Sequence, residues 1–548
     1  MAKSPSKVTT PYYQPPASQP PARVPVAPGK AAVPTAATGG QKPLRSTSQR
    51  MFYQARNTFK GQFVVVASGC MLFAIVLAIF LSLSFQRASD DLNTIAYGSI
   101  PSVNAAQALA QYIDDIDAKS ADYLATATLH NTIACTVPVA NSGTLAMGQE
   151  TTHTCDQQTI DAEINLANHQ LFEAAHNVTY PGERTAVERI TEGMEEYSSQ
   201  MTVMMHEFDL ATNKGDPNDP HMQLAYQAYL DASSVLHNRI VRQPARNAQG
   251  QIVFDESASC TINNQVLPIN QWALGSLDTN ITCLSQINKN YLDSAYNDTS
   301  GFVGYTIALA ILLCLVFCGL LVFTTVRMVF VTHRVIHPAL MLALLMAIIL
   351  SIASTGLFTS LGGRHGVYGQ MVKDDYLSVY DAALLQRYGT NANADESRWL
   401  IALEFNRQDE VTRWANDWQT NTQQVSNYIA MAQQNQTWPQ EIQPLADMHT
   451  YWGKYYTIDG QIRSMANNVA DPNRIQDAEV ISTGRSNDAF GSFSDAVHRL
   501  SQANDYHYKL TLSATTGLLM TYILWSAVLS SIAGLLAVWG ISRRLKDF

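Results

Sequence analysis

Long uncharged stretches alternate with long polar ones along this chain. Four runs contain no Asp, Glu, Lys or Arg: residues 62–85, 302–326, 339–361 and 515–541. At about 1.5 Å of rise per residue, each run is long enough to cross a hydrocarbon core of about 30 Å as a helix. Buried helices of a large soluble protein are the alternative, but four such runs in one chain favour a membrane protein. We therefore predict four transmembrane helices.

The charges that flank these runs predict an orientation. Residues 1–61 hold nine Lys or Arg and no acidic residue, and the short segments 327–338 and 542–548 are also basic. By the positive-inside bias these three segments lie in the cytoplasm, and segments 86–301 and 362–514 lie outside. The expected location is the plasma membrane, crossed several times, with both termini cytoplasmic. The basic tail lacks an RNA or DNA motif, so nucleic-acid binding is not expected.

The cysteines divide by environment. Three fall inside apolar runs, whereas Cys135, Cys155, Cys260 and Cys283 all lie in segment 86–301. An even number on the oxidising side of a membrane indicates two disulfides. Four cysteines can pair in three ways. We expect the way that forms the two local bridges, Cys135–Cys155 and Cys260–Cys283, because each bridge closes a single loop. A zinc site is the alternative, and it is disfavoured because the spacings contain no CxxC.

The N-terminal tail has its own composition. Residues 1–61 hold ten of the 21 prolines, centred on PPASQPPARVPVAP. Such a segment cannot bury a core, and we expect it to be disordered with polyproline character. It either recruits a proline-binding partner or acts as a spacer whose last positive charges touch anionic membrane lipids, and the second interpretation is favoured.

Both outer segments show helical periodicity. In the first, apolar and small residues recur at spacings of three and four, at Val103, Ala106, Ala110, Ile113, Asp117, Ser120, Leu124 and Ala127. This spacing is typical of a coiled-coil-like seam, here with two polar members. Breaks rich in Pro, Gly and Asn divide each segment into four helices. The last helix of the first segment is expected to span about residues 219–300.

Several motifs of the first segment return in the second. The matching stretches are NVTYPGE (177–183) with NQTWPQE (435–441), DAKSADYL (117–124) with NADESRWL (393–400), and the SQxN…TG approaches to the second and fourth apolar runs. A tandem duplication explains all three. We predict an all-α membrane protein with four transmembrane helices and two tandemly duplicated outer four-helix bundles, residues 86–301 and 362–514. The first copy is longer at two places, where each disulfide would staple an inserted loop.

The repeated Pro motif has a structural explanation. Thr179, Pro181 and Glu183 match Thr437, Pro439 and Glu441, and Pro suits the first position of a helix and Glu the third. The Asn residues that open the two motifs are also formal glycosylation sequons. Helix-start geometry accounts for both motifs without a sugar, and we favour it.

One polar cluster could bind a ligand. Asp117 and Ser120 occupy the seam, and Asn393 is the counterpart of Asp117 in the second copy. They could instead fix helix register or oligomeric state, which is the commoner role of polar groups in a seam. Asp114 and Asp115 are expected on the solvated face, and Arg239 or Arg242 could complement the acid. Motifs of known enzymes are missing from the sequence, so we expect no catalysis, no cofactor and no metal ion.

The arrangement of span, outer bundle and span resembles the sensory module of bacterial chemoreceptors and transmembrane histidine kinases. The similar stretches are IPSVNAAQALAQ (100–111), HRVIHPAL (333–340) after the second span and GISRRLKDF (540–548) at the end. The pair NxT[YW]P and NADESRWL is similar, over about residues 60–548, to uncharacterised bacterial four-pass membrane proteins with two such bundles. The ligand-contacting arginines of chemoreceptors have no assignable match.

The resemblance implies a receptor-like or accessory sensing protein of the membrane. The second span is followed directly by a third, and no output domain of the chemoreceptor kind follows the fourth, so we expect the signal to pass to a partner protein. The outer bundles or the cytoplasmic tails would hold that partner, and association with further copies of the chain is left open. A structural or assembly subunit of a membrane complex is the alternative.

Overall fold

The computed structural model describes residues 59–126, 132–139, 143–244, 249, 252, 254, 258–262, 265–333, 337–362 and 366–546. The predictions for the Pro-rich tail fall almost entirely on residues 1–58 and lie outside the described residues. Residues 59–548 form one compact unit. We call residues 59–333 the first half and residues 337–546 the second half.

The first half is built from helices and two short hairpins. Its elements are α2 (Phe59–Asn93), the π-helical η1 (Thr94–Ser99), α3 (Ile100–Ala125), β1 (Thr132–Val139), β2 (Gly143–Thr151), α4 (Thr152–His176), α5 (Glu183–Leu210), α6 (Pro220–His237), β3 (Ser259–Ile262), β4 (Gln265–Pro268), α7 (Ile269–Trp272) and α8 (Leu277–Thr332). β1 pairs antiparallel with β2, and β3 with β4.

The described part of the second half is entirely helical. Its elements are α9 (Pro338–Leu361), α10 (Val367–Gly369), the π-helical η3 (Gln370–Tyr376), α11 (Leu377–Glu404), α12 (Gln408–Gln434), the 3₁₀-helical η4 (Pro439–Glu441), α13 (Ile442–Ala466), α14 (Arg474–Ile481), the π-helical η5 (Ser482–Ser486) and α15 (Asn487–Leu545). The predicted all-α class fits this architecture.

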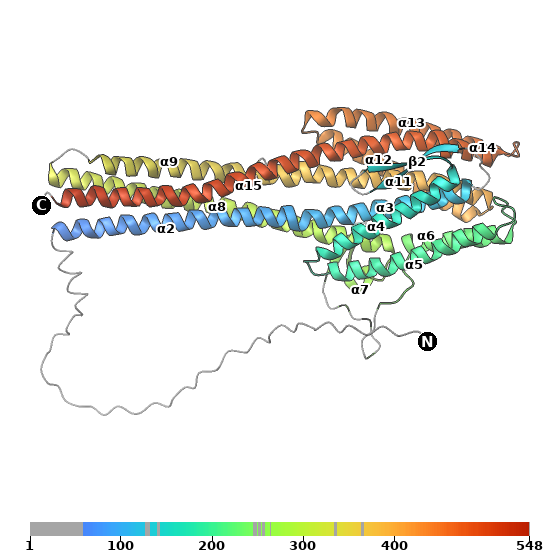
Figure 1. The fold of residues 1–548 in the computed structure, drawn as a ribbon, viewed down its shortest axis with the longest axis horizontal. Coiled ribbons are helices and arrows are strands. Elements are labelled where there is room, and N and C mark those ends of the chain that lie inside the picture. The colour runs from blue at the N-terminus through green and yellow to red at the C-terminus, as the bar shows by residue number, and fades with distance from the viewer. Residues whose placement is uncertain are drawn as a thin grey trace, which may run out of the picture. The chain divides into compact units, whose positions relative to one another are not determined.

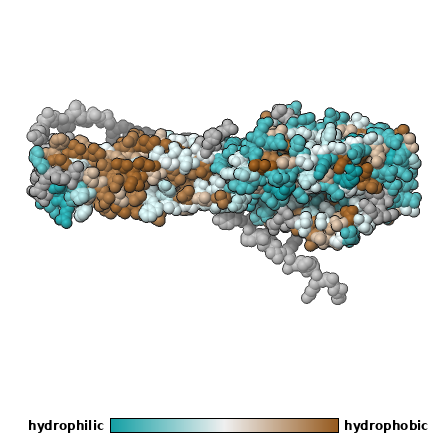
Figure 2. All heavy atoms as spheres, turned by 90° about the horizontal axis from the view of Figure 1, so that it is seen from above, coloured by the Kyte–Doolittle hydropathy of each residue, from teal (hydrophilic) through white to brown (hydrophobic). Residues whose placement is uncertain are grey.

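Four helices are long and apolar enough to cross a membrane: α2, α8, α9 and α15. They run side by side at one end of residues 59–546, and their apolar side chains form a continuous hydrophobic band on the outside (Figures 1 and 2). We call this part the apolar bundle. Small residues allow close packing inside it, as where Gly534 of α15 faces Ala74 of α2. The structure agrees with the prediction of a four-span membrane protein.

The remaining helices form the part that we call the head, residues 86–301 and 362–514. Three continuous helices join the head to the apolar bundle: Gly61–Ala125, Leu277–Val331 and Arg474–Leu545. Each passes from a polar into an apolar sequence without a loop (Figure 1). The head and the apolar bundle therefore share these three helices.

The two halves of the head pack against each other along α3 and α11. Aromatic side chains reinforce the contact, because Tyr226 of α6 stacks on Phe405 after α11 with ring centroids 4.4 Å apart. Ile401 and Phe405 belong to the same hydrophobic core as the first-half helices. The head is thus a single body with helices from both halves in its core.

The predicted seam of the first outer helix is confirmed. From Val103 to Leu124 every seam position is at most 2% exposed, including Asp117 and Ser120. Ala127, the last position, lies outside the described residues. First-half helices and α11 bury the seam together, so the seam contacts both halves.

The expected single helix over residues 219–300 is wrong. The chain forms α6, leaves the helix after His237, makes only the four-residue α7 (Ile269–Trp272) and resumes a long helix at α8. The interruption carries Pro244 and Pro268, which cannot occupy helix interiors without losing a backbone hydrogen bond. Both hairpins occur in the two places where the first copy was expected to hold inserted loops.

The predicted disulfide pairing is confirmed at both hairpins. Cys135 bonds Cys155 with an S–S distance of 2.07 Å, and Cys260 bonds Cys283 at 2.16 Å. The first joins β1 to α4, and the second joins β3 to α8. Each bridge therefore fastens a hairpin to the helix that follows it.

The Pro motifs begin their helices differently. In the second motif Pro439 opens η4 and Glu441 is the third residue, as predicted. In the first motif α5 begins only at Glu183, because Gly182 adopts a left-handed φ of 94°. A Cβ at Gly182 would lie 2.4 Å from the Ala258 Cβ, so glycine allows the insert to approach.

Candidate functional site

A groove of about 1030 Å³ lies between the two halves of the head. Residues of α11 form its floor, α8 and β3 form one wall, and α12 forms the other. The floor residues recur every three or four positions along α11, at Leu377, Asp381, Leu384, Tyr388, Asn391, Asp395 and Arg398. This spacing places them on one face of the helix. The groove combines aromatic side chains with charged ones.

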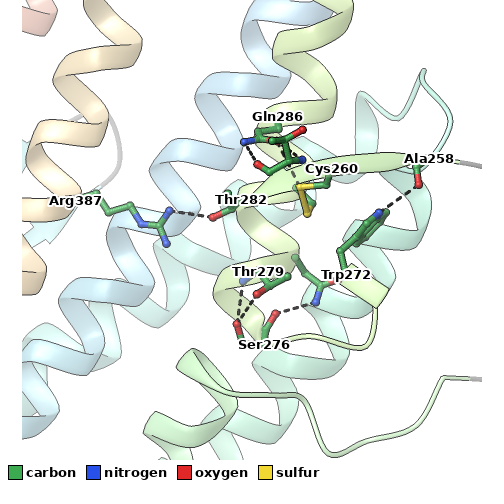
Figure 3. Close-up of a disulfide and its surroundings, with 11 residues drawn as sticks. Ala258, Cys260, Trp272, Ser276, Thr279, Thr282, Gln286 and Arg387 are labelled. Atoms are coloured by element: carbon green, nitrogen blue, oxygen red, sulfur yellow. Dashed lines mark hydrogen bonds between the residues drawn. A yellow bond between two sulfur atoms is a disulfide. The ribbon is translucent and has the colours of Figure 1, made fainter. Parts of the chain in front are cut away.

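Arg387 fastens the floor of the groove to the first half. Its guanidinium donates to the Asp114 carboxylate of α3 at 2.9 Å and to the Thr282 hydroxyl of α8 at 3.2 Å, and it forms an ion pair with Asp278. Figure 3 shows Arg387 reaching across to Thr282. Asp114 is only 1% exposed, so the expectation of a solvated side chain there was wrong. The contact with α11 covers it.

The β3–β4 hairpin, which the Cys260–Cys283 disulfide links to α8, forms part of the same groove wall as α8. The Gln286 side chain of α8 accepts a hydrogen bond from the backbone N–H of Thr261 at 2.8 Å and donates one to the Thr261 carbonyl. The Trp272 indole donates to the Ala258 carbonyl at 3.4 Å (Figure 3). Thr261 and Gln286 both line the groove. The Cys260–Cys283 bridge therefore holds a groove wall in place.

The deepest end of the groove is closed by Arg398. Its guanidinium forms an ion pair with Asp117 of α3, donates to Asp395 at 2.7 Å and donates to the Tyr229 hydroxyl of α6 at 3.2 Å. Arg398 and Asp117 are 1% and 0% exposed. The Tyr197 hydroxyl of α5 adds a donor to Asp117 at 3.2 Å. One arginine of the second half thus binds two helices of the first, α3 and α6, and Tyr197 of α5 joins the cluster through Asp117.

Two carboxylates, those of Asp117 and Asp395, share one guanidinium in this Arg398 cluster. Burial alone would raise the pKa of Asp117, but Arg398 and the nearby His237 outweigh it and lower that pKa to about 2. The ion pair holds the pKa of Arg398 well above its usual value, although burial opposes this. Asp117 and Arg398 are therefore both charged throughout the physiological pH range.

The three residues predicted as a ligand site lie close to the groove but do not line it. Asp117 belongs to the Arg398 cluster. The Ser120 hydroxyl donates to the Ile116 carbonyl at 2.5 Å within its own helix, and Asn393 donates to the Asn487 side chain at 3.2 Å. The structure thus brings Asp117 to the groove's inner end and directs Asn393 toward α15.

The partner of Asp117 was not found by sequence reasoning. Arg242, one of two arginines expected to complement the acid, instead pairs with Glu195 of α5. The observed partner, Arg398, lies in the repeated NADESRWL stretch, two residues from its Leu. The available signal was the alignment of the two repeats, which places Arg398 on the helix that corresponds to the one carrying Asp117.

A second set of buried acids lies between α3 and α4. The carboxyls of Asp115 and Glu163 interact by a hydrogen bond, and burial together with the Asp115 charge raises the pKa of Glu163 well above its ordinary value. Lys119 forms ion pairs with Asp122 at 3.2 Å and Asp156 at 3.4 Å. The Asp115–Glu163 pair therefore retains one shared proton at pH values where exposed carboxyls are ionised.

Because of this pair, we expect the free energy of unfolding to decrease as the pH rises. A raised pKa means that the folded state holds a proton that the unfolded chain has lost. The free energy of unfolding therefore declines above the ordinary Glu pKa of about 4.5, by up to about 1.4 kcal/mol per pH unit. Glu163→Gln should flatten this decline between pH 5 and pH 8 in thermal unfolding. Glu173→Gln, on the exposed face of α4, is the control and should follow the wild type. Equal slopes for Glu163→Gln and the wild type would contradict the shared proton.

Within the described ranges, no three His, Cys, Asp or Glu side chains gather in an arrangement that could hold a metal ion. The groove instead presents hydroxyl, amide, aromatic and charged groups, which suits a polar organic ligand. Comparison with known proteins found no matching family model, no matching curated protein and no matching solved structure.

Proposed function

We propose that the protein is a receptor-like or accessory sensing protein of the plasma membrane that relays a signal to a partner protein. The observation that carries the proposal is the course of α8. Its first turns form a wall of the groove, and the same unbroken helix continues through the apolar bundle to Thr332. A ligand in the groove would contact a membrane helix directly, and helix shifts of about 1–2 Å occur in allosteric transitions of other proteins.

The proposed orientation places the head outside the cell and both termini in the cytoplasm. The basic segments that flank the apolar bundle and the two disulfides of the head support it, because disulfides persist on the oxidising side of a membrane. The cytoplasmic ends of α8 and α15 would then present the signal to the partner.

The proposed origin of the head is a duplicated four-helix unit. The π-helical segments η1 and η3 support it, since they lie 276 positions apart (Thr94 to Gln370), the offset that also separates DAKSADYL from NADESRWL. The Pro motifs support it too. Glu183 accepts from the N–H groups of Thr179 and Tyr180, at 2.5 and 2.6 Å, and Glu441 accepts from those of Thr437 and Trp438, at 2.6 and 2.8 Å.

These matching contacts predict matching energetic costs. Glu183→Gln and Glu441→Gln should each lower the free energy of unfolding by about 1–2 kcal/mol, because each removes the charge that two backbone donors share. Glu188→Gln, on the exposed face of α5, should change it by less than about 0.5 kcal/mol. Chemical unfolding of the three variants measures this. A cost confined to one motif would contradict the duplication.

The proposed function is tested by crosslinking the full-length protein in its native membrane and identifying bound proteins by mass spectrometry. The expected result is a signalling output protein crosslinked near residues 333–340 or 540–546. Recovery of copies of this chain alone, or of the components of a filament or transport complex, would overturn the sensing role. The protein would then be a structural or assembly subunit, for which the locked halves of the head would be suited.

A further inference from the structure

One carboxylate of the groove takes part in no ion pair and no hydrogen bond among the described residues. Among the charged side chains that line it, each arginine forms an ion pair: Arg387 with Asp114 and Asp278, Arg398 with Asp117 and Asp395, and Arg413 with Asp417 at 3.7 Å. Lys289 pairs with Asp293 at 3.0 Å. In the described part of the chain, Asp381 alone of these groove carboxylates has neither an ion pair nor a hydrogen bond.

The nearest lysines are already engaged. Lys289 and Lys373 both bind Asp293, at 3.0 and 2.5 Å, so two ammonium groups share one carboxylate while Asp381 has no such partner. Asp381 is half-buried and stands at the point where the groove continues into a second hollow of about 540 Å³. A charge partly removed from water without a partner is unfavourable, and a cationic ligand would relieve this cost.

Aromatic side chains line the groove on the same helix as this carboxylate and on the facing wall. Tyr388 lies two helical turns from Asp381 on the floor, and it stacks on Tyr428 of the opposite wall with ring centroids 5.6 Å apart. Tyr380 lines the groove beside Asp381 and has the Lys289 ammonium 5.8 Å from its ring centre. Aromatic faces beside a carboxylate attract organic cations by combining cation–π and ionic interactions.

We propose that the groove binds a small organic cation whose ammonium group sits against the Asp381 carboxylate and the rings of Tyr388 and Tyr428. This inference names the ligand class of the sensor, and its biological meaning rests on the proposed function, whereas the binding stands on the groove alone. The volume admits ligands larger than choline, so choline serves as a probe of the ammonium position and does not fill the site.

Titration calorimetry of the full-length protein in nanodiscs tests the proposal with two probes of equal shape. Choline carries a quaternary ammonium, and 3,3-dimethyl-1-butanol replaces its nitrogen by carbon and is neutral. We expect choline to bind with a Kd of about 1 mM or tighter, and the alcohol at least about 10-fold more weakly. Equal binding of the two probes, or no binding of choline, would overturn the proposal.

Matched variants assign the binding to the residues named. Asp381→Asn keeps the shape of the side chain and should weaken choline binding at least about 10-fold, whereas Asp495→Asn on the exposed face of α15 should leave it unchanged. Tyr428→Phe keeps the ring and should bind within about 3-fold of the wild type, and Tyr428→Leu should not. Unchanged binding in Asp381→Asn, or equal loss in both Tyr428 variants, would contradict the proposed site.

Binding should also depend on pH. Burial raises the pKa of Asp381 to about 6, with Lys289 of α8 opposing it, and choline keeps its charge at every pH. Burial raises the pKa values of Tyr380 and Tyr428, and Asp293 has its pKa lowered by Lys373 and Lys289 against the effect of burial, so these three groups do not titrate between pH 5 and 8. Asp395, at the Arg398 end of the same groove, also has its pKa raised by burial to about 6, with Arg398 opposing this, so Asp381→Asn must remove the pH dependence if Asp381 is its source. Choline binding should therefore weaken as the pH falls through about 6. Stronger binding at low pH would contradict the role of Asp381.

The two proposals fail separately. Choline binding that depends on Asp381, without any signalling protein among the crosslinked partners, would retain the cation site and reject the sensing role. A crosslinked output protein without choline binding would retain the sensing role and reject the ligand class.

Discussion

Replacing Arg398 with methionine should lower the free energy of unfolding of the head by about 3–5 kcal/mol. The substitution leaves the carboxylates of Asp117 and Asp395 in the interior without their shared cation, and both are at most 1% exposed. It also removes the bond to the Tyr229 hydroxyl and the stacking of the guanidinium 4.8 Å above the Trp414 ring. Urea unfolding in nanodiscs, followed by tryptophan fluorescence, measures the loss.

A neighbouring arginine provides the control. Arg413 stacks on Trp414 at 4.3 Å, but its side chain is 34% exposed and its ion pairs are 3.7 Å long. Arg413→Met should therefore cost no more than about 1 kcal/mol. Adding Asp117→Asn to Arg398→Met removes one uncompensated charge and should recover part of the loss. A cost below about 1 kcal/mol for Arg398→Met would show that the two halves are not held together by this ion pair.

Removing either disulfide should lower the free energy of unfolding by about 3 kcal/mol. The bridges Cys135–Cys155 and Cys260–Cys283 close loops with sequence separations of 20 and 23, and loops of nearly equal length restrict the unfolded chain almost equally. Double Cys→Ala variants of each pair, compared by thermal unfolding, measure the effect. Loss of one bridge at no cost in stability would contradict this prediction.

The two variants should differ in their effect on the groove. The Cys260–Cys283 bridge anchors the hairpin that includes Thr261 in the groove wall, whereas Cys135 lies in β1, outside the groove lining. Choline binding should therefore weaken when Cys260 and Cys283 are replaced and stay unchanged when Cys135 and Cys155 are replaced. The second variant serves as the matched control for a general loss of stability.

Features that depend on residues of one continuous segment could be predicted from the sequence. The four spanning helices follow from uninterrupted apolar composition, and the seam from Val103 to Leu124 follows from spacing alone. The local disulfide pairing also followed, because each pair lies within one insertion of the first copy. These features depend on residues close in sequence, and periodicity and composition report on such residues directly.

Contacts between the halves could not be predicted in this way. Arg398 and Asp117 are 281 positions apart, and nothing in the pattern of either helix indicates that α3 packs on α11. Asp114 was expected on the solvated face, and that face of α3 is covered by the second half. The interruption between α6 and α8 was missed because the flanking segments are both helical. The groove itself exists only through this packing.

The central claim is that a change in the groove moves α8 relative to α2 in the apolar bundle. Arg327 of α8 donates to the Gln62 side chain of α2 at 2.9 Å, so these positions report on the two helices at the far end. Spin labels on Gln62→Cys and Arg327→Cys, with the three free cysteines replaced by alanine, give the distance between them by electron paramagnetic resonance.

The comparison uses two bulky substitutions on the same helix. Thr282→Trp places a large side chain in the groove between α8 and α11, and Ser294→Trp places the same side chain on the exposed face of α8. If α8 carries a change from the groove into the apolar bundle, Thr282→Trp should shift the distance between the labels by about 1–2 Å, and Ser294→Trp should leave it unchanged. Identical distances in both variants and in the parent protein would contradict a relay through α8.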